Sequence, residues 1–464
     1  MRRLAFALGA TLALAGPVQA AMLVGAARIP AAARDGVGET LGGFGSGMAL
    51  VPGSVKRTRN GISGTLAMVP DRGWNTEGTS DYRARVQMFD FSLRPQSGAP
   101  HAQTGLDLRL RRTLLLTDGE GAPTTGLDPS GVRPGGKDFP DLPAAPNGRV
   151  SLDNEAVALP GDGSFWVSDE YGPLIYHYDA GGRMTGAIRP PEAIIPHRGG
   201  KENFSAGESV KGEPQSGRQN NQGFEGMSIA PGAKTLFVMT QSALVQDLDP
   251  SAAKSSRRNV RLLEYDIAGT PRLIHEYAVQ LPLYDEGGKT NVAAQSEMLA
   301  IDDHRLLLLC RDSGGGFAGK RDASAYRIVN IIDTAGADDI AGRYDAAGDS
   351  IAPGGQLRSD IRPARVRPFL DINDNAQLAR FGLHNGAPSD RGDLYEKWEG
   401  LALAPAGDPA SPDDYFLFVG SDNDFITQHG MMAGKSYSDA SGADVDTLVL
   451  VYRVTLPGYG GPRK

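Results

Sequence analysis

Short runs of alternating apolar and polar residues, separated by glycine-rich turns, recur along most of the chain. In Asn154-Glu155-Ala156-Val157-Ala158-Leu159 a glutamate leads into such a run. An alternation with a period of two is typical of a β-strand. The pattern returns at 224–229, 296–301 and 398–403, and a degenerate copy at 45–50 carries Ser46 in place of the glutamate. These repeats predict equivalent strands in five similar units.

Further strands follow in each unit. Second strands are expected to end at polar clusters. Third strands are predicted at 86–91, 175–178, 262–267, 326–332 and 447–454. Fourth strands are predicted at 106–116, 273–279 and 366–370. Four antiparallel strands repeated around an axis form propeller blades. The predicted fold class is therefore all-β, a β-propeller of four-stranded antiparallel blades. Five blades are recognisable, a sixth could lie in the longer inserts, and the early strand at 22–29 would close the ring.

The N-terminus resembles an export signal. Arg2 and Arg3 precede an apolar run from Leu4 to Leu14, and small residues follow at Ala20 and Ala21. Such a run is too short to span a membrane, which takes about 20 residues. We predict a signal peptide at 1–20, a single propeller domain at 21–464, and a periplasmic or secreted protein without membrane insertion. The inserts at 119–150, 196–222 and 336–360 are interpreted as surface loops because they are rich in Gly, Pro, Ser or charged residues.

Composition narrows the functional classes. The net charge of −8 disfavours nucleic acid as a partner. Cys310, the only cysteine, lies in an apolar run and is interpreted as a small buried hydrophobe. The chain has no Gly-x-Ser-x-Gly elbow, no phosphate-binding glycine loop and no zinc-type ligand spacing. We expect a monomer that binds a small molecule.

The repeated acids should converge in space. Neighbouring strands of a blade run antiparallel, so the start of the first strand lies beside the end of the second. The expected neighbours are Glu155 with Asp169 and Glu170, Glu297 with Asp312, and Glu399 with Asp422 and Asp424. Because the first strands line the axis, Glu225, Asp71 and Ser46 should join the same mouth of the channel.

Crowded carboxylates repel one another, which raises their pKa values unless a cation compensates. Arg72 and Arg311 could supply that charge, and so could calcium, which accepts six to eight oxygen ligands. The candidate ligands are Glu155, Glu225, Glu297, Glu399, Asp71, Asp169, Asp312 and Asp422. The alternative is structural, with each glutamate accepting backbone N–H bonds from a neighbouring blade.

Several of these motifs together resemble the bacterial phytase-like family, whose members are labelled "esterase-like activity of phytase". They are Pro70-Asp71-Arg72-Gly73, Asn154-Glu155-Ala156 with 168–173, Phe224-Glu225-Gly226, and Trp398-Glu399-Gly400 with 421–424. The resemblance runs from about Leu23 to Leu456, and it implies a repeated β domain associated with phosphoester hydrolysis. Ser46 and Thr240-Gln241 depart from the acidic pattern.

The resemblance leads to an enzyme hypothesis, a calcium-assisted phosphoric-ester hydrolase. Calcium would polarise a phosphoryl oxygen and lower the pKa of a bound water. Arg72 and Arg311 would bind the anionic oxygens, and Glu155 or Asp169 would accept the proton of the water. One alternative is a non-catalytic propeller that binds a cation, a sugar or a peptide at the same mouth. The other is a set of purely structural acids.

Overall fold

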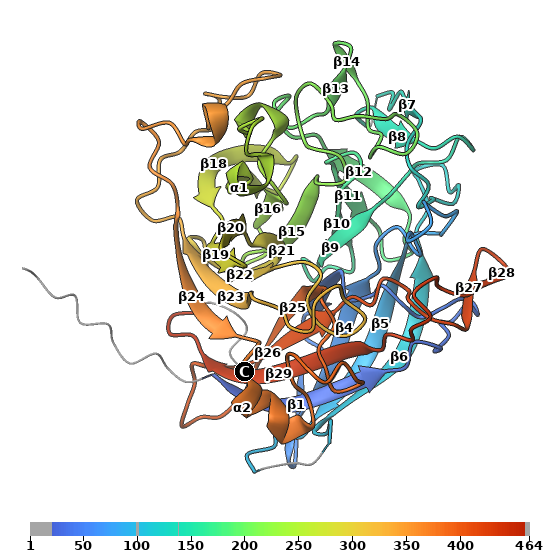
Figure 1. The fold of residues 1–464 in the computed structure, drawn as a ribbon, viewed down its shortest axis with the longest axis vertical. Helices are drawn as coiled ribbons and strands as arrows, with labels where there is room; N and C mark the ends of the chain where they lie inside the picture. Colours follow the sequence, from blue (N-terminus) through green and yellow to red (C-terminus); the bar gives the residue numbers. More distant parts are fainter. Residues whose placement is uncertain (1–20, 99–101, 138, 460–464) are drawn as a thin grey trace, which may run out of the picture.

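Five antiparallel sheets stand around a central axis in a computed structural model (Figure 1). The structure describes residues 21–98, 102–137 and 139–459. The predicted signal peptide at 1–20 lies outside the described residues. The all-β prediction is confirmed, and the described residues form five blades without a sixth.

Each blade has four strands in the order inner to outer. Blade 1 contains β2 (Gly47–Leu50), β4 (Gly61–Val69), β5 (Arg85–Leu93) and β6 (Leu106–Leu115), with β3 (Lys56–Thr58) paired to β4. Blade 2 contains β9 (Asn154–Ala158), β10 (Phe165–Asp169), β11 (Ile175–Tyr178) and β12 (Met184–Ile188). Blade 3 contains β15 (Phe224–Ile229), β16 (Thr235–Thr240), β17 (Asn259–Asp266) and β18 (Arg272–Gln280). Blade 4 contains β21 (Ala294–Ala300), β22 (Arg305–Arg311), β23 (Arg327–Asp333) and β24 (Arg365–Asp371).

Blade 5 combines the two ends of the described chain. It contains β25 (Trp398–Pro405), β26 (Asp414–Ser421), β29 (Thr447–Thr455) and β1 (Met22–Ile29). β1 runs antiparallel to β29, with Met22 opposite Arg453 and Ile29 opposite Thr447. In Figure 1 the blue strand β1 lies beside the red strand β29. The predicted closure of the ring by an N-terminal strand is confirmed.

The second strands contain apolar runs because both of their faces are buried between blades. In β22, Leu307 and Leu309 pack into the core shared with blade 5, whereas Leu308 and Cys310 pack into the core shared with blade 3. Strand residues alternate between faces, so one apolar run supplies two cores. Burial raises the pKa of the Cys310 thiol, in keeping with its interpretation as a hydrophobe.

The inner strands contact one another in a closed circle, in the order β2, β9, β15, β21 and β25. Their approach explains the glycines that recur in the repeats. A Cβ atom on Gly47 would lie 2.6 Å from the carbonyl oxygen of Glu155, and one on Gly226 would lie 2.8 Å from the amide nitrogen of Met298. Glycine therefore lets neighbouring inner strands meet at this level of the axis.

Shorter elements decorate the connections. They are the hairpins β7 (Gly131–Arg133) with β8 (Leu142–Ala144), β13 (His197–Arg198) with β14 (Lys201–Glu202), β19 (Leu283–Glu286) with β20 (Lys289–Val292), and β27 (Gly430–Met432) with β28 (Lys435–Tyr437). The helices are η1 (Val245–Asp247), α1 (Ala253–Ser256), η2 (Pro353–Gly355), α2 (Asn375–Leu378) and η3 (Ala379–Phe381). Within the described residues, no helix has the length and apolar character needed to cross a membrane.

The interpretation of the insert at 196–222 as a surface loop is wrong in part. Its Arg218 is fully buried and donates hydrogen bonds to the carbonyl oxygens of Tyr171, at 2.7 Å, and Phe204, at 2.5 Å. A buried guanidinium needs such acceptors because it loses its hydration. Arg218 thereby fixes the insert to the end of blade 2, beside the inner strands.

Candidate functional site

A polar cavity of about 180 Å³ lies at the end of the axis where the inner strands begin. All five blades contribute to it. Its lining consists of Asp71, Arg72, Asn75, Asp153, Glu155, Glu170, Asn221, Glu225, Gln241, Arg311, Lys397, Glu399 and Asp424. Seven of these residues are acidic and three are basic, which leaves four carboxylates in excess.

A first carboxylate group, which we call the blade 2 triad, consists of Asp153, Glu155 and Glu170. Each residue offers an oxygen within 4.8 Å of the others, and all three side chains are buried. Asp153 and Glu155 flank the first residue of β9, and Glu170 directly follows β10. The buried Oε1 of Glu170 has no hydrogen-bond partner among the described residues.

Arg72 forms an ion pair with only one member of the blade 2 triad. Its backbone N–H and its Nη1 both lie 3.0 Å from carboxylate oxygens of Asp153, and Nη1 also donates to the side chain of Asn221. The guanidinium lies 5.8 Å from the centre of the Tyr171 ring. Arg72 thus holds Asp153 in place and leaves the two glutamates available to another cation.

Three glutamates of the cavity, Glu155, Glu170 and Glu225, have raised pKa values. Burial raises the pKa of Glu155 and Glu170, and the neighbouring carboxylates Glu225 and Asp153 raise them further. Burial, followed by the charge of Glu399, raises the pKa of Glu225 to about 8. The buried Oε2 of Glu225 also has no hydrogen-bond partner in the described part of the chain. These acids must hold protons or gain a counter-charge, and hard oxygen ligands in this number suit calcium.

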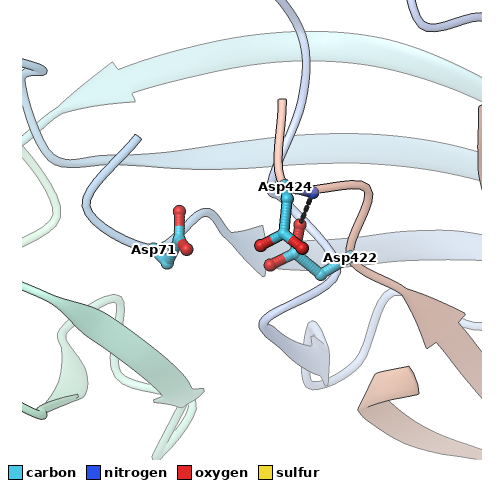
Figure 2. Close-up of side chains that lie close together, drawn as sticks. All are labelled: Asp71, Asp422 and Asp424. Atoms are coloured by element: carbon cyan, nitrogen blue, oxygen red, sulfur yellow. Dashed lines mark hydrogen bonds between the residues drawn. The ribbon is translucent and has the colours of Figure 1, made fainter. Parts of the chain in front are cut away.

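A second carboxylate group, the Lys397 cluster, consists of Asp71, Asp422 and Asp424. Figure 2 shows the three side chains converging, with Asp71 on one segment and the other two on the segment after β26. Their oxygens also lie within 4.8 Å of one another. Oδ1 of Asp422 accepts a 2.7 Å hydrogen bond from the backbone N–H of Asp424, whose φ is +50°. This bond stabilises the left-handed turn that brings the two aspartates together.

The ammonium group of Lys397 lies among the three aspartates of the Lys397 cluster. Its Nζ lies 2.7 Å from Asp422, 2.8 Å from Asp424, 3.7 Å from Asp71 and 3.4 Å from Glu399. Burial acts to lower the pKa of Lys397, but the surrounding carboxylates, Asp422 and Asp424 foremost, raise it well above its ordinary value. The lysine therefore stays charged and takes the place that a cation would take.

Arg311 and Glu399 form an ion pair across blades 4 and 5. Nη2 of Arg311 lies 2.5 Å from Oε1 of Glu399, and its Nε donates to the hydroxyl of Ser296 at 3.1 Å. Both predicted arginines, Arg72 and Arg311, therefore line the cavity. The predicted approach of Glu399 to Asp422 and Asp424 is also found, with Lys397 between them.

Asp169 lies near the cavity but is not part of its lining. Its carboxylate accepts hydrogen bonds from the backbone N–H groups of Asp153, Tyr171 and Gly172, and from the hydroxyl of Tyr176. Burial raises the pKa of Asp169 to about 7, although these bonds oppose the rise. With both oxygens engaged, Asp169 shapes the turn that presents Glu170 and has no free oxygen for a metal or a water.

Glu297 and Asp312 are likewise not part of the lining of the candidate site. Oε1 of Glu297 accepts backbone N–H bonds from Met298, at 2.9 Å, and Met227, at 3.3 Å, so it ties β21 to β15. Asp312 accepts bonds from the hydroxyl of Ser324 and the backbone N–H of Ala325. The structural alternative thus describes Oε1 of Glu297, whereas its buried Oε2 has no hydrogen-bond partner among the described residues. Neither Glu297 nor Asp312 lines the cavity with most of the other predicted metal ligands.

The sequence patterns did not indicate Asp153, Lys397 and Asn221 as members of the site. Asp153 and Lys397 each stand two residues before a repeated glutamate, so a comparison of this position between the repeats could have found them. Asn221 lies in the insert before β15, where no repeat marks it. Ser46 lies at the predicted place, and its hydroxyl donates to Asp422 at 3.1 Å.

A five-bladed ring with a charged cavity at one end of its axis defines a β-propeller with an axial polar cavity. The chain belongs to the Phytase-like family, since the family model described as "Esterase-like activity of phytase" matches residues 40–425. A relative from Arthroderma benhamiae is 41% identical over 453 residues, covering 88% of this chain and 87% of the relative. That relative carries the name "Uncharacterized secreted protein".

Solved structures show weaker similarity. A hydrazine synthase from Kuenenia stuttgartiensis is 12% identical, with a TM-score of 0.30 and coverage of 82% of this chain and 77% of the other. A putative 6-phosphogluconolactonase from Bacteroides uniformis is 14% identical, with a TM-score of 0.27 and coverage of 88% of each chain. Similarity at this level does not bear on the site.

Proposed function

We propose that the protein is an exported phosphoric-ester hydrolase that works with a divalent cation, calcium, at the blade 2 triad. The observation that supports this proposal is the pairing, in one buried cavity, of a triad containing an unpartnered carboxylate oxygen with three cationic side chains. Export is supported by the signal-like residues 1–20 and by the name of the secreted relative.

Asp153, Glu155 and Glu170 would hold the cation, and the free Oε2 of Glu225 could complete the protein ligands or receive a proton. When bound, calcium would polarise a phosphoryl oxygen and lower the pKa of a coordinated water. A pKa of about 8 leaves Glu225 largely protonated at neutral pH without a cation and suits it to exchange protons once a cation is bound. We therefore propose that Glu225 or Glu155, and not Asp169, accepts the proton of the coordinated water.

Arg72, Arg311 and Lys397 would bind the phosphoryl oxygens. The buried Nε of Arg72 has no hydrogen-bond partner among the described residues, so it offers a donor to an anion. The planar guanidinium suits phosphate geometry. The excess of four carboxylates would repel a phosphate, and a divalent cation would offset two of those four charges.

One observation favours a non-catalytic binding propeller as the second candidate. Arg72 and Arg311 are already engaged by Asp153 and Glu399, so a phosphate would have to compete with these ion pairs. This candidate would bind a cation without turnover, whereas the hydrolase would release phosphate.

Titration calorimetry of the chelator-treated mature protein with calcium, magnesium and manganese tests the cation, and phosphate release from a panel of phosphomonoesters tests the reaction. We expect calcium binding, and calcium-dependent turnover that Arg72→Lys lowers by about 100-fold through loss of planar donors. Arg109→Lys, at an exposed position of β6, is the matched control. Calcium binding without turnover would favour the second candidate, and absence of cation binding would contradict both.

A further inference from the structure

Asn221 lies at the candidate site in a backbone conformation that few residues adopt. Its φ is +50°, in the left-handed region, and its half-buried side chain lines the cavity. This region costs free energy for residues other than glycine, although asparagine tolerates it better than most. Backbone strain of this kind persists only where the surrounding structure imposes it, and it is concentrated at functional sites.

The three residues before Asn221 hold it in place, because each is bound to a different part of the molecule. Arg218 donates to a backbone carbonyl at the end of blade 2, at 2.7 Å. The side chain of Gln219 donates to a backbone carbonyl that follows β16 of blade 3, also at 2.7 Å. The backbone N–H of Asn220 donates to a glutamate of the same insert at 2.8 Å. The segment 218–221 is therefore a fixed support that carries Asn221 into the cavity.

The contact with Arg72 determines which atom of the Asn221 amide remains free. A guanidinium carries only donors, so Asn221 must present its carbonyl oxygen Oδ1 to Nη1 of Arg72. Arg72 is held in turn by Asp153, which accepts from Nη1 at 3.0 Å. The amide nitrogen Nδ2 lies on the other branch of the planar group and has no hydrogen-bond partner in the described part of the chain. Because Asn221 lines the cavity, Nδ2 is the donor that it can offer there.

The charges of the cavity make a neutral donor useful. Arg72 and Arg311 are engaged by carboxylates, so an anion that binds them must compete with an ion pair. No carboxylate among the described residues engages Nδ2 of Asn221, and an anion can accept its hydrogen bond without breaking one. The amide also adds no charge to a lining that already has four carboxylates in excess.

We propose that Asn221 is a further catalytic residue, whose Nδ2 donates a hydrogen bond to a phosphoryl oxygen in the transition state of hydrolysis. The proposal rests on the proposed function, because the phosphoryl group is assigned to this cavity. Arg72 orients the amide in addition to making its own contact with the phosphoryl group. The amide keeps both of its protons, so Asn221 forms and breaks no covalent bond. A donor fixed in advance stabilises the transition state without having to reorganise during the reaction.

Steady-state kinetics of the calcium-loaded protein with p-nitrophenyl phosphate test this role. Asn221→Gly removes the amide, and glycine adopts a φ of +50° without strain. We expect kcat to fall about 100-fold while KM changes by less than about threefold, as for a donor used in the transition state. Asn60→Gly, at an exposed turn position of blade 1, is the matched control and should keep wild-type kinetics.

A double-mutant cycle with Arg72 separates a direct contact from an effect on the arginine. If Asn221 contacts the phosphoryl group, Asn221→Gly should still lower kcat by at least about 10-fold in the Arg72→Lys background. A loss that is present in the wild-type background and absent in the Arg72→Lys background would mean that Asn221 only orients Arg72. That result would overturn the proposal.

Titration calorimetry of the calcium-loaded protein with orthovanadate distinguishes failure of this proposal from failure of the proposed function. If the wild type binds orthovanadate without releasing phosphate from any ester, and Asn221→Gly binds it about 10-fold more weakly, the hydrolase fails and the anion contact of Asn221 stands. If Asn221→Gly hydrolyses p-nitrophenyl phosphate as well as the wild type does, the proposal is overturned and the hydrolase stands. If the wild type neither binds orthovanadate nor releases phosphate, both are overturned.

Discussion

The ammonium nitrogen of Lys397 lies 2.7 Å from Oδ2 of Asp422, inside a group of three aspartates that would otherwise resemble a metal site. This contact distinguishes the two carboxylate groups of the cavity. The Lys397 cluster carries its own cation, whereas the blade 2 triad has only Arg72, which engages Asp153. The protein should therefore bind one divalent cation at the axis rather than two.

Removing the lysine should convert the Lys397 cluster into a second cation site. Without a cation, Lys397→Met leaves buried carboxylates uncompensated and should lower the free energy of unfolding by about 3–5 kcal/mol. Calcium should restore part of the loss, and calorimetry should then report two sites. Urea unfolding with chelator and with calcium measures the effect, and Lys234→Met is the exposed control. An unchanged unfolding free energy in chelator would contradict the assigned role of Lys397.

Glu170 should be required for the calcium response. Calcium at about 100 times its dissociation constant should raise the wild-type unfolding free energy by about 2.7 kcal/mol, because it binds only the folded state. Glu170→Gln removes a ligand whose Oε1 is otherwise unpartnered, so most of this rise should disappear. Scanning calorimetry in chelator should show no loss of stability in this variant. A full calcium response in Glu170→Gln would place the cation elsewhere.

Two acids of the repeat pattern should instead act on stability alone. Asp169→Asn and Glu297→Gln each weaken acceptors for buried backbone N–H groups and should lower the free energy of unfolding by about 1–3 kcal/mol. Their calcium-dependent stabilisation should match that of the wild type. Denaturant unfolding with and without calcium checks both statements. Loss of the calcium response in a folded Asp169→Asn protein would return Asp169 to the set of ligands.

The cation-free protein should lose stability as the pH rises. The pKa of Glu225 is about 8 in the folded protein, against an ordinary value of 4.5, so folding favours its protonated form. Its contribution to stability is complete below the ordinary pKa and is lost as the pH rises through about 8. In urea unfolding with chelator, the unfolding free energy of the Glu225→Gln variant should therefore depend less on pH than that of the wild type. Equal pH dependence of the two proteins would be evidence against the raised pKa.

Calcium binding should release protons near neutral pH. A cation favours the ionised forms of Glu155, Glu170 and Glu225, whose pKa values burial raises. Calcium titrations in buffers with different ionisation enthalpies should give different apparent binding enthalpies. The slope of the apparent binding enthalpy against the buffer ionisation enthalpy gives the number of protons released. A slope of zero would mean that these carboxyl groups are already ionised before the cation binds.

The repeats predicted the fold because each blade reuses the same local pattern. The glutamates at the start of β9, β15 and β25 marked inner strands, and antiparallel pairing brought their side chains to one mouth. The fourth strand of blade 2, β12, was missed because the run at 184–188 alternates only weakly. The five-blade ring with its N-terminal closing strand is nonetheless the one predicted.

The detailed site was less accessible to sequence reasoning because a carboxylate's role depends on the direction in which it points. Asp169 and Glu170 are neighbours, yet the first accepts backbone hydrogen bonds and the second faces the cavity. Glu297 and Glu399 occupy equivalent repeat positions, yet one accepts backbone N–H bonds and the other pairs with Arg311. Asn221 comes from the insert at 196–222, where no repeat marks it.

The pairing of β1 with β29 has a consequence for the order of folding. In the described chain, blades 1 to 4 are each built from consecutive segments, whereas blade 5 needs strands from both ends. Bringing such distant segments together carries the largest loop-closure entropy, so blade 5 should assemble last. Lys397 and Glu399 belong to that blade, and until it docks Asp71 lacks the ammonium that neutralises it in the finished ring. The cavity therefore acquires its full set of charged side chains in the same step that closes the ring.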